Sequence, residues 1–183
     1  LSLLGENGSG KTTLMNMLSG IYFPDEGQIY IDGQPVTIAS PKDAFDCGIG
    51  MIHQHFKLVD LFTATENIIL GLEGKLDIAE ASKKVKEICD RYGFDIDPNQ
   101  KIYDMSVSQK QTIEIIKVLY RGADILILDE PISGVDVEGM TTLMDMLDEI
   151  RKTYDLSILM TTHDFSMLPR YANQAVLIDS TIR

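Results

Sequence analysis

The pattern of apolar and polar residues alternates along the chain between short apolar runs and stripes with a helical period. Apolar runs of strand length occupy residues 1–4, 49–52, 125–128, 156–160 and 175–178. Amphipathic stripes of helix length occupy residues 12–18, 77–92, 106–121 and 135–154. The run at 125–128 has no polar residue, which is typical of a strand buried on both faces of a parallel sheet. Strands that alternate with helices in this way predict an α/β fold with a parallel sheet.

Two stretches depart from this alternation. The dipeptide Asp32-Gly33 predicts a small antiparallel hairpin that pairs residues 28–31 with residues 34–36. Residues 61–121 read only as helices, so we expect them to form a helical insertion. The expected division is a single domain, 1–183, with its core at residues 1–60 and 122–183.

The first apolar run leads into a glycine-rich turn. Residues 5–12 fit the pattern G-x-x-x-x-G-K-[ST] at each fixed position. Glycines let the backbone curl and aim several N–H groups at one anion, and the N-terminus of the following helix adds its own N–H groups. Lys11 can then reach the β- and γ-phosphates of a nucleotide, and the Thr12 hydroxyl can bind Mg²⁺. The alternative is an ordinary glycine-rich turn. The residues expected to hold ATP here are Gly5, Glu6, Asn7, Gly8, Ser9, Gly10, Lys11, Thr12 and Thr13.

Composition limits the kinds of partner. The chain has 183 residues, 44% of them hydrophobic, and a net charge of −12. This charge argues against direct binding of nucleic acid or anionic lipid, and it favours a partner with basic cytoplasmic loops, as membrane proteins have. Cys47 and Cys89 are isolated, so the sequence indicates neither a disulfide framework nor a zinc site. We therefore expect a reducing compartment.

Two carboxylates follow the buried run at 125–128. A carboxylate at the end of a buried strand is costly unless a cation offsets its charge, so Asp129 is a candidate Mg²⁺ ligand. Glu130 comes next and could polarise a water molecule for in-line attack on a γ-phosphate. The alternative is a strand-terminal acidic turn or a helix cap. Because ligands of parallel sheets bind at the carboxyl ends of the strands, the upstream phosphate loop favours the magnesium site.

Two further strand ends carry polar side chains. Gln54 follows the run at 49–52, where the core passes into the helical insertion, and its amide could bind Mg²⁺ and a water molecule. His163 follows the run at 156–160 and could donate to a γ-phosphate oxygen. The alternatives are an exposed loop glutamine and a structural histidine. The residues alone leave both alternatives open.

Taken in chain order, these segments resemble the nucleotide-binding domain of an ATP-binding cassette (ABC) transporter. Residues 5–12 match the Walker A motif, Gln54 the Q-loop, residues 125–130 the Walker B motif and His163 the switch histidine. The likeness also identifies a signature motif at residues 105–109 and a D-loop at 133–136.

The resemblance implies a fold and a set of roles. The implied fold is a P-loop NTPase with a RecA-like parallel core, a small antiparallel part and an inserted helical subdomain. Catalytic roles would fall to Glu130, His163 and Lys11, and the metal ligands would be Thr12, Gln54 and Asp129. Further contacts to ATP would come from Gln54, Ser106, Val107, Ser108, Gln109 and Asp136.

A narrower resemblance is to importers of simple sugars and nucleosides, and especially to the first cassette of their double-cassette ATPases. It rests on the amino-acid sequence of five segments, residues 4–8, 49–56, 65–68, 92–98 and 119–124. It implies ATP hydrolysis coupled to uptake of a nucleoside or simple sugar, at the cytoplasmic face of the cell membrane. The implied partners are a second cassette, in a homodimer or on the same polypeptide, a membrane permease and, indirectly, an external substrate-binding protein. No nucleic acid is expected.

Departures from the family pattern lead to further expectations. The signature usually has Gly where Val107 or Ser108 stands, and Thr112 replaces a usual basic residue. If position 108 required a positive φ, its serine would strain the backbone and weaken the site, and Ser108→Gly would raise turnover.

Since the chain begins on the strand before the phosphate loop, we also expect a missing N-terminal segment with the adenine-stacking aromatic residue. The alternative functions are an ATP-binding cassette that hydrolyses poorly and a soluble ABC ATPase outside transport.

Overall fold

The computed structural model describes residues 1–52, 57–72, 74, 77–131, 137–153, 156–162 and 168–178. The chain divides into two compact units, and each is described by itself. The core unit comprises Leu1–Gln54, Ala123–Ser133 and Met144–Arg183, and the helical unit comprises His55–Gly122 and Gly134–Leu143. The expected single domain, 1–183, stays a prediction.

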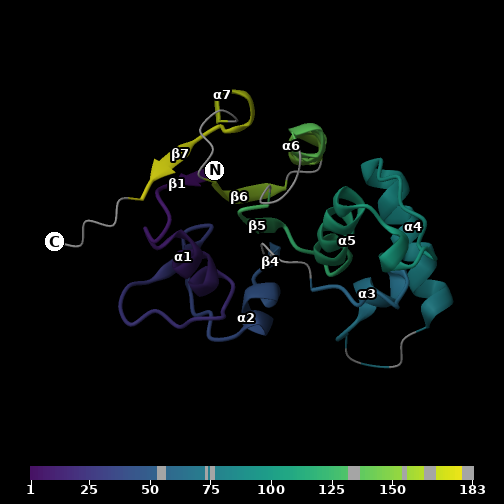
Figure 1. The fold of residues 1–183 in the computed structure, drawn as a ribbon. Helices are drawn as coiled ribbons and strands as arrows, with labels where there is room; N and C mark the ends of the chain where they lie inside the picture. The colour runs from purple at the N-terminus through teal and green to yellow at the C-terminus, as the bar shows by residue number, and fades with distance from the viewer. Residues whose placement is uncertain are drawn as a thin grey trace. The chain divides into compact units, whose positions relative to one another are not determined.

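A parallel sheet forms the centre of the core unit, with its strands in the order β4-β5-β6-β1-β7 (Figure 1). The strands are β1 (Ser2–Leu4), β4 (Ile49–Ile52), β5 (Ile125–Asp129), β6 (Ser157–Thr162) and β7 (Ala175–Leu177). Every neighbouring pair among them runs parallel. Leu126, Ile127 and Leu128 of β5 are at most 1% exposed, as befits a strand covered on both faces. The predicted parallel α/β core is confirmed.

The helices of the core unit are α1 (Lys11–Leu18), α2 (Pro41–Asp46), α7 (Leu168–Tyr171) and, from Met144 on, α6 (Val137–Thr153). Helix α1 is anchored through Met15, which is fully buried in one cluster with Leu3 of β1 and Ile127 of β5. Met15 lies about one helical turn after Lys11. The packing of Met15 therefore fixes the first turn of α1 against the sheet.

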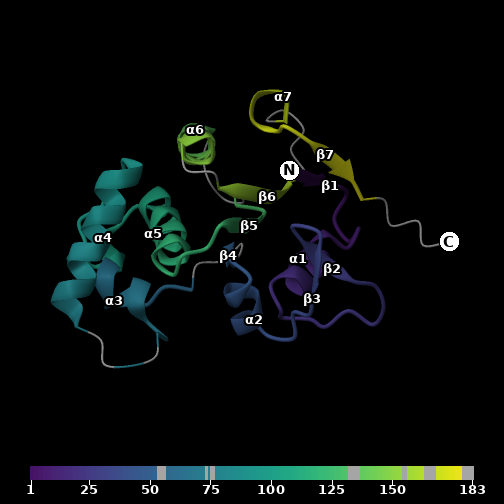
Figure 2. The same cartoon turned by 180° about the vertical axis from the view of Figure 1, so that it is seen from behind.

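Strands β2 (Ile29–Ile31) and β3 (Gln34–Val36) form the predicted antiparallel hairpin, beside α1 in Figure 2. Both turn residues have a positive φ, 50° at Asp32 and 75° at Gly33, as a two-residue hairpin turn requires. Ile29, Ile31 and Val36 pack against the cluster around Met15. The hairpin thus adds to the apolar cluster that anchors α1.

The helical unit contains α3 (Ala64–Ile69), α4 (Ile78–Tyr92), a short 3-10 helix (Ile102–Asp104) and α5 (Val107–Tyr120). Its fully buried residues include Ile68, Val85, Ile102, Ile113 and Ile116. Thr63 and Glu66 close a capping box at the start of α3, and Gly93 ends α4 with a φ of 72°. The helices predicted at 77–92 and 106–121 are confirmed. Within the described ranges, no helix combines the length and apolar character needed to cross a membrane.

The burial of β5 generates a stability prediction. Ile127→Ala should lower the free energy of unfolding by about 2–5 kcal/mol, because it leaves a cavity where α1 and the sheet meet. The matched control is Ile78→Ala, since Ile78 is 53% exposed. That control should change the stability by less than about 0.5 kcal/mol. Urea unfolding measures both, and equal effects would contradict the assigned core.

Candidate functional site

The phosphate loop predicted from the sequence connects β1 to α1 and borders a hollow of about 750 Å³ that is open to solvent. The hollow is lined by Asn7, Gly8, Gly10, Lys11, Thr12, Thr13 and Glu130. Most of these residues belong to the glycine-rich pattern, and Glu130 comes from the end of β5. The fold therefore brings the loop and a carboxylate of the Walker B segment to one site within the core unit.

Lys11 holds the loop in its curled form. Its side chain is 4% exposed, and Nζ donates to the carbonyl oxygens of Gly5 at 2.7 Å and Glu6 at 3.0 Å. An ammonium has three N–H donors, so one remains for an anion in the hollow. The buried positive charge makes an anionic ligand favourable there.

Glycine is required in the loop for two different reasons. Gly8 and Gly10 have φ values of 86° and 96°, and a Cβ on either would meet nothing within 4 Å, so they are needed for their backbone conformation. Gly5 is needed for space, because a Cβ there would lie 2.5 Å from both the Ile178 carbonyl oxygen and Ser9 Oγ.

The N-terminus of α1 is open to a ligand. Gly10 is its N-cap residue and no side chain caps the helix, so the first amides of α1 have no side-chain acceptor. Ser9 Oγ is buried and has no hydrogen-bond partner among the described residues. Of the groups around the hollow, the backbone amides and the Lys11 ammonium are the kinds that bind phosphate oxygens. The loop thus fits the triphosphate of ATP.

Two oxygen ligands suited to Mg²⁺ meet at the edge of this hollow. Thr12 Oγ1, from the first turn of α1, donates to Asp129 Oδ1, at the end of β5, over 3.3 Å. The two residues are 117 positions apart in sequence. Asp129 is 6% exposed, and Mg²⁺ is commonly bound through one or two protein oxygens plus substrate phosphates. The residues present therefore fit a magnesium ion.

Glu130 has an unusual backbone conformation. Its φ is 47°, in the left-handed region that a residue with a side chain seldom adopts. Such strain persists where the surroundings hold it, and it is concentrated at functional sites. The conformation separates the Glu130 side chain from that of Asp129, so that Glu130 lines the hollow.

The signature residues lie in the helical unit, at the start of α5. Ser106 is the N-cap: Gln109 N donates to Ser106 Oγ at 3.2 Å, and Ser106 N donates to Gln109 Oε1 at 3.0 Å. Val107 is 50% exposed.

The condition for strain at Ser108 is not met. Among the described residues other than glycine, a positive φ occurs at Asp32 and Glu130 and not at Ser108, which lies in the first turn of α5. Ser108 Oγ is 3.0 Å from Ser106 Oγ, and its carbonyl accepts from Thr112 Oγ1 at 3.1 Å. The expected strain at position 108, which was the reason to expect a higher turnover from Ser108→Gly, is therefore wrong. Within a helix, serine is favoured over glycine.

Three residues expected at the site, Gln54, Asp136 and His163, lie outside the described residues, and their roles stay predictions. One residue was missed by the sequence reasoning. Thr161 of β6 is fully buried and hydrogen-bonds Asp129 Oδ1 at 2.8 Å. Its signal was its place near a strand end, directly opposite Asp129 in the parallel register.

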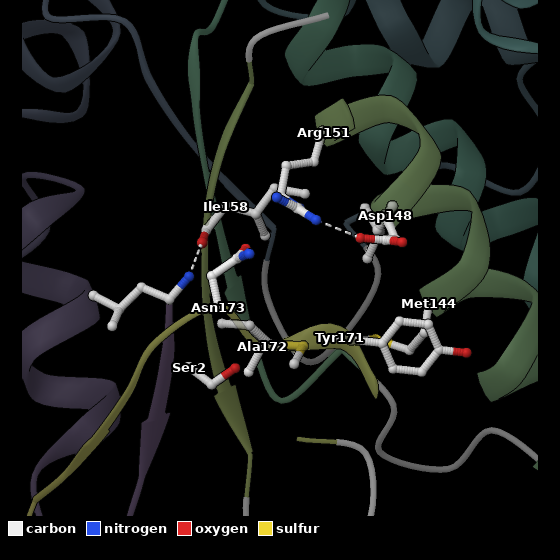
Figure 3. A pocket seen from close by; sticks show the side chains of 11 residues that line it. Ser2, Met144, Asp148, Arg151, Ile158, Tyr171, Ala172 and Asn173 are labelled. Carbon is white, nitrogen blue, oxygen red and sulfur yellow. Dashed lines mark hydrogen bonds and ion pairs between the residues drawn. The ribbon is translucent and has the colours of Figure 1, made fainter. Parts of the chain in front are cut away.

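The core unit has a second hollow, of about 410 Å³, among β1, β6, α6 and residues 171–173 (Figure 3). Arg151 of the lining donates to Asp148 Oδ1 at 2.6 Å. Its positive charge is thus paired within the chain. The phosphate loop, with its open helix end and spare ammonium donor, is the stronger candidate for an anion site.

Comparisons with known proteins agree with this site. A family model described as "ABC transporter" matches residues 1–133. The chain is 47% identical over 181 residues to the nucleoside import ATP-binding protein NupA of Lactococcus lactis, covering 97% of this chain and 36% of that protein. It is 51% identical over 155 residues to the guanosine import ATP-binding protein NupO of Bacillus subtilis, covering 82% of this chain and 30% of that protein.

The fold also has solved counterparts. The structure of cbiO1 from Clostridium perfringens, part of the ABC transporter complex cbiONQ, matches with a TM-score of 0.83 at 29% identity. The match covers 98% of this chain and 72% of that one. The chain spans about a third of the length of the two import proteins it matches. Together with the phosphate loop and the carboxylates at its edge, these matches show that the chain belongs to the ABC transporter family.

Proposed function

We propose that this chain is an ATP-binding and ATP-hydrolysing cassette of an ABC importer, and that hydrolysis drives uptake of a nucleoside or a simple sugar. One observation carries the proposal. The phosphate loop and Glu130 line the same hollow, and Asp129 and Thr12 lie at its edge. The names of the relatives, nucleoside and guanosine import proteins, support the substrate class.

The residues of the hollow divide the work of hydrolysis. Lys11 and the first amides of α1 bind the phosphate oxygens and offset their charge. Thr12 and Asp129 hold Mg²⁺, which neutralises charge on the phosphates when it is bound. Glu130 accepts the proton of the attacking water molecule. From the family likeness, we assign Gln54 to the metal and the attacking water, His163 to the γ-phosphate and Asp136 to a contact with ATP.

The proposed assembly contains two cassettes, each with ATP between its own phosphate loop and the other cassette's signature. Ser106 and the amides that open α5 would contact the γ-phosphate across the interface. ATP would then favour the closed pair, and hydrolysis would remove the charge that holds it closed.

The permease would dock, at the cytoplasmic face of the membrane, on an exposed apolar patch of the helical unit that consists of Leu61 and Tyr103. Leu61 and Tyr103, 74% and 58% exposed, belong to segments joined by a hydrogen bond from Ile102 N to the Phe62 carbonyl at 3.0 Å. Exposed apolar side chains held on a rigid backbone are typical of a protein interface. An external substrate-binding protein would deliver the substrate to that permease.

Binding of ATP is tested at Lys11. Lys11→Ala should weaken ATP binding by at least about tenfold, because it removes a charge-assisted hydrogen bond and the support of the loop carbonyls. Lys42→Ala, which removes an exposed lysine of α2 in the same unit, is the control and should bind as the wild type does. Calorimetry suits the measurement because the chain has no tryptophan. Equal affinities would refute the assignment of the phosphate site.

Hydrolysis is tested at Glu130. Glu130→Gln should lower turnover by about 10²–10⁴-fold, because the amide cannot accept the proton, while ATP binding is retained. Glu149→Gln, on the exposed face of α6, is the matched control. Phosphate release from the reconstituted transporter measures both. Unchanged turnover in Glu130→Gln would favour the alternative, a cassette that binds ATP and hydrolyses it poorly.

Docking is tested at Leu61. Leu61→Ser should reduce co-purification with the permease encoded by the neighbouring coding sequence, because it removes the most exposed apolar side chain of the patch. Ile78→Ser, which likewise replaces an exposed aliphatic side chain of the helical unit with serine, should leave co-purification intact. If both variants co-purify with the permease as the wild type does, this patch is not the docking surface.

A further inference from the structure

The hydroxyl group of Thr161 lies between the two carboxylate residues of the site. Thr161 belongs to β6, pairs with Asp129 of β5 in the parallel register and is 0% exposed. Its Oγ1 is 2.8 Å from Asp129 Oδ1 and also 2.8 Å from the backbone N of Glu130. One buried oxygen thus contacts both the proposed Mg²⁺ ligand and the backbone of the proposed general base.

The directions of these hydrogen bonds are fixed by the groups that make them. A backbone N–H can only donate, so Thr161 Oγ1 accepts from Glu130. The single hydroxyl proton of Thr161 then goes to Asp129 Oδ1. A hydroxyl that accepts and donates at once is polarised, which strengthens both bonds.

This arrangement orients the Asp129 carboxylate. Among the described residues, its side-chain hydrogen bonds, from Thr161 and from Thr12, both end on Oδ1. Oδ2 therefore keeps its lone pairs for Mg²⁺ or for a water molecule bound to the ion. Within the described ranges, loss of the Thr161 hydroxyl would leave the carboxylate with the longer 3.3 Å contact to Thr12 alone.

The same hydroxyl supports the strained backbone of Glu130. The φ of 47° at this residue is disfavoured for a side chain that has a Cβ, and the bond from its own N–H to Thr161 counteracts that preference. Valine could fill the volume of Thr161 in the sheet but could form neither bond. The residue type at position 161 is therefore explained by the bonds and not by packing alone.

We propose that Thr161 is a positioning residue that couples the Mg²⁺ ligand Asp129 to the general base Glu130. The proposal rests on the ATP-binding function proposed above. In this role Thr161 acts through the direction of one carboxylate and the backbone position of the other.

The test measures how much Mg²⁺ strengthens nucleotide binding. A non-hydrolysable ATP analogue is titrated by calorimetry in the presence of Mg²⁺ and again in EDTA, and the ratio of the two affinities is compared between variants. Thr161→Val should lower this ratio about tenfold or more, since the loss of a group that orients a metal ligand typically has that effect. Binding in EDTA should be unchanged, and Thr161→Ser should restore the ratio.

The control is a buried threonine far from the loop in sequence. Thr65 is 1% exposed, and its hydroxyl donates to the Pro98 carbonyl at 2.9 Å within the helical unit. Thr65→Val should cost stability as Thr161→Val does but should keep the wild-type ratio. If Thr161→Val keeps the ratio too, the coupling is refuted while ATP binding by the wild type still stands. If the wild type binds no nucleotide, both proposals fail.

A measurement on the unaltered protein covers the case in which Thr161→Val does not fold. The Glu130 amide should exchange its hydrogen slowly, because it donates to a buried hydroxyl. In Thr161→Ser, which keeps the hydroxyl, the exchange should remain slow. Exchange at the rate of an exposed loop amide in the wild type would overturn the proposal.

Discussion

The site depends on one buried positive charge that is shared between the protein and an anion. Lys11 donates two of its N–H groups to carbonyl oxygens of the loop that precedes it, which keeps the loop curled. A buried ammonium whose hydrogen bonds go to carbonyl oxygens is costly to keep charged, so the arrangement favours a phosphate group in the adjoining hollow. The open N-terminus of α1 adds to this preference. The curled loop, the helix start and the hollow thus follow from the same electrostatic requirement.

The parallel sheet supplies the remainder of the site. Strands that run in the same direction end at the same edge, so Thr12, which follows β1, and Asp129 and Thr161, at the ends of β5 and β6, meet although they are far apart in sequence. Met15 anchors α1 to β1 and β5 and so keeps Thr12 within reach of Asp129. The hydrogen bonds of Thr161 then join the ends of β5 and β6. The relative positions of Thr12, Asp129 and Thr161 are therefore set by the buried sheet.

The structural features that could be predicted from the sequence are those whose signal lies in a few consecutive residues. The glycine-rich turn between β1 and α1 and the hairpin at Asp32-Gly33 have local signatures, and both turns are confirmed, while phosphate binding by the first stays a prediction. The meeting of Thr12 with Asp129 was also predictable, because the strand-end rule needs only the order of elements. The signature and D-loop came from likeness to a family, and for Asp136, as for Gln54 and His163, the roles stay predictions.

Thr161 and Ser108 show what the sequence could not provide. The value of Thr161 depends on the register between β5 and β6, and apolar periodicity leaves that register open. For Ser108 the conformation depends on where α5 begins, and the choice of Ser106 as the N-cap places Ser108 inside the helix. Both are cases in which a contact between specific atoms, and not a residue pattern, decides the outcome.

The central claim is that the loop around Lys11 binds a triphosphate and that carboxylates from neighbouring strand ends serve its metal and its attacking water molecule. A crystal structure of the protein with Mg²⁺ and a non-hydrolysable ATP analogue tests it most directly. The account predicts the phosphates against Gly8, Gly10 and Lys11, and the metal beside Thr12 and Asp129. An empty loop, or Asp129 turned away from the metal, would contradict it.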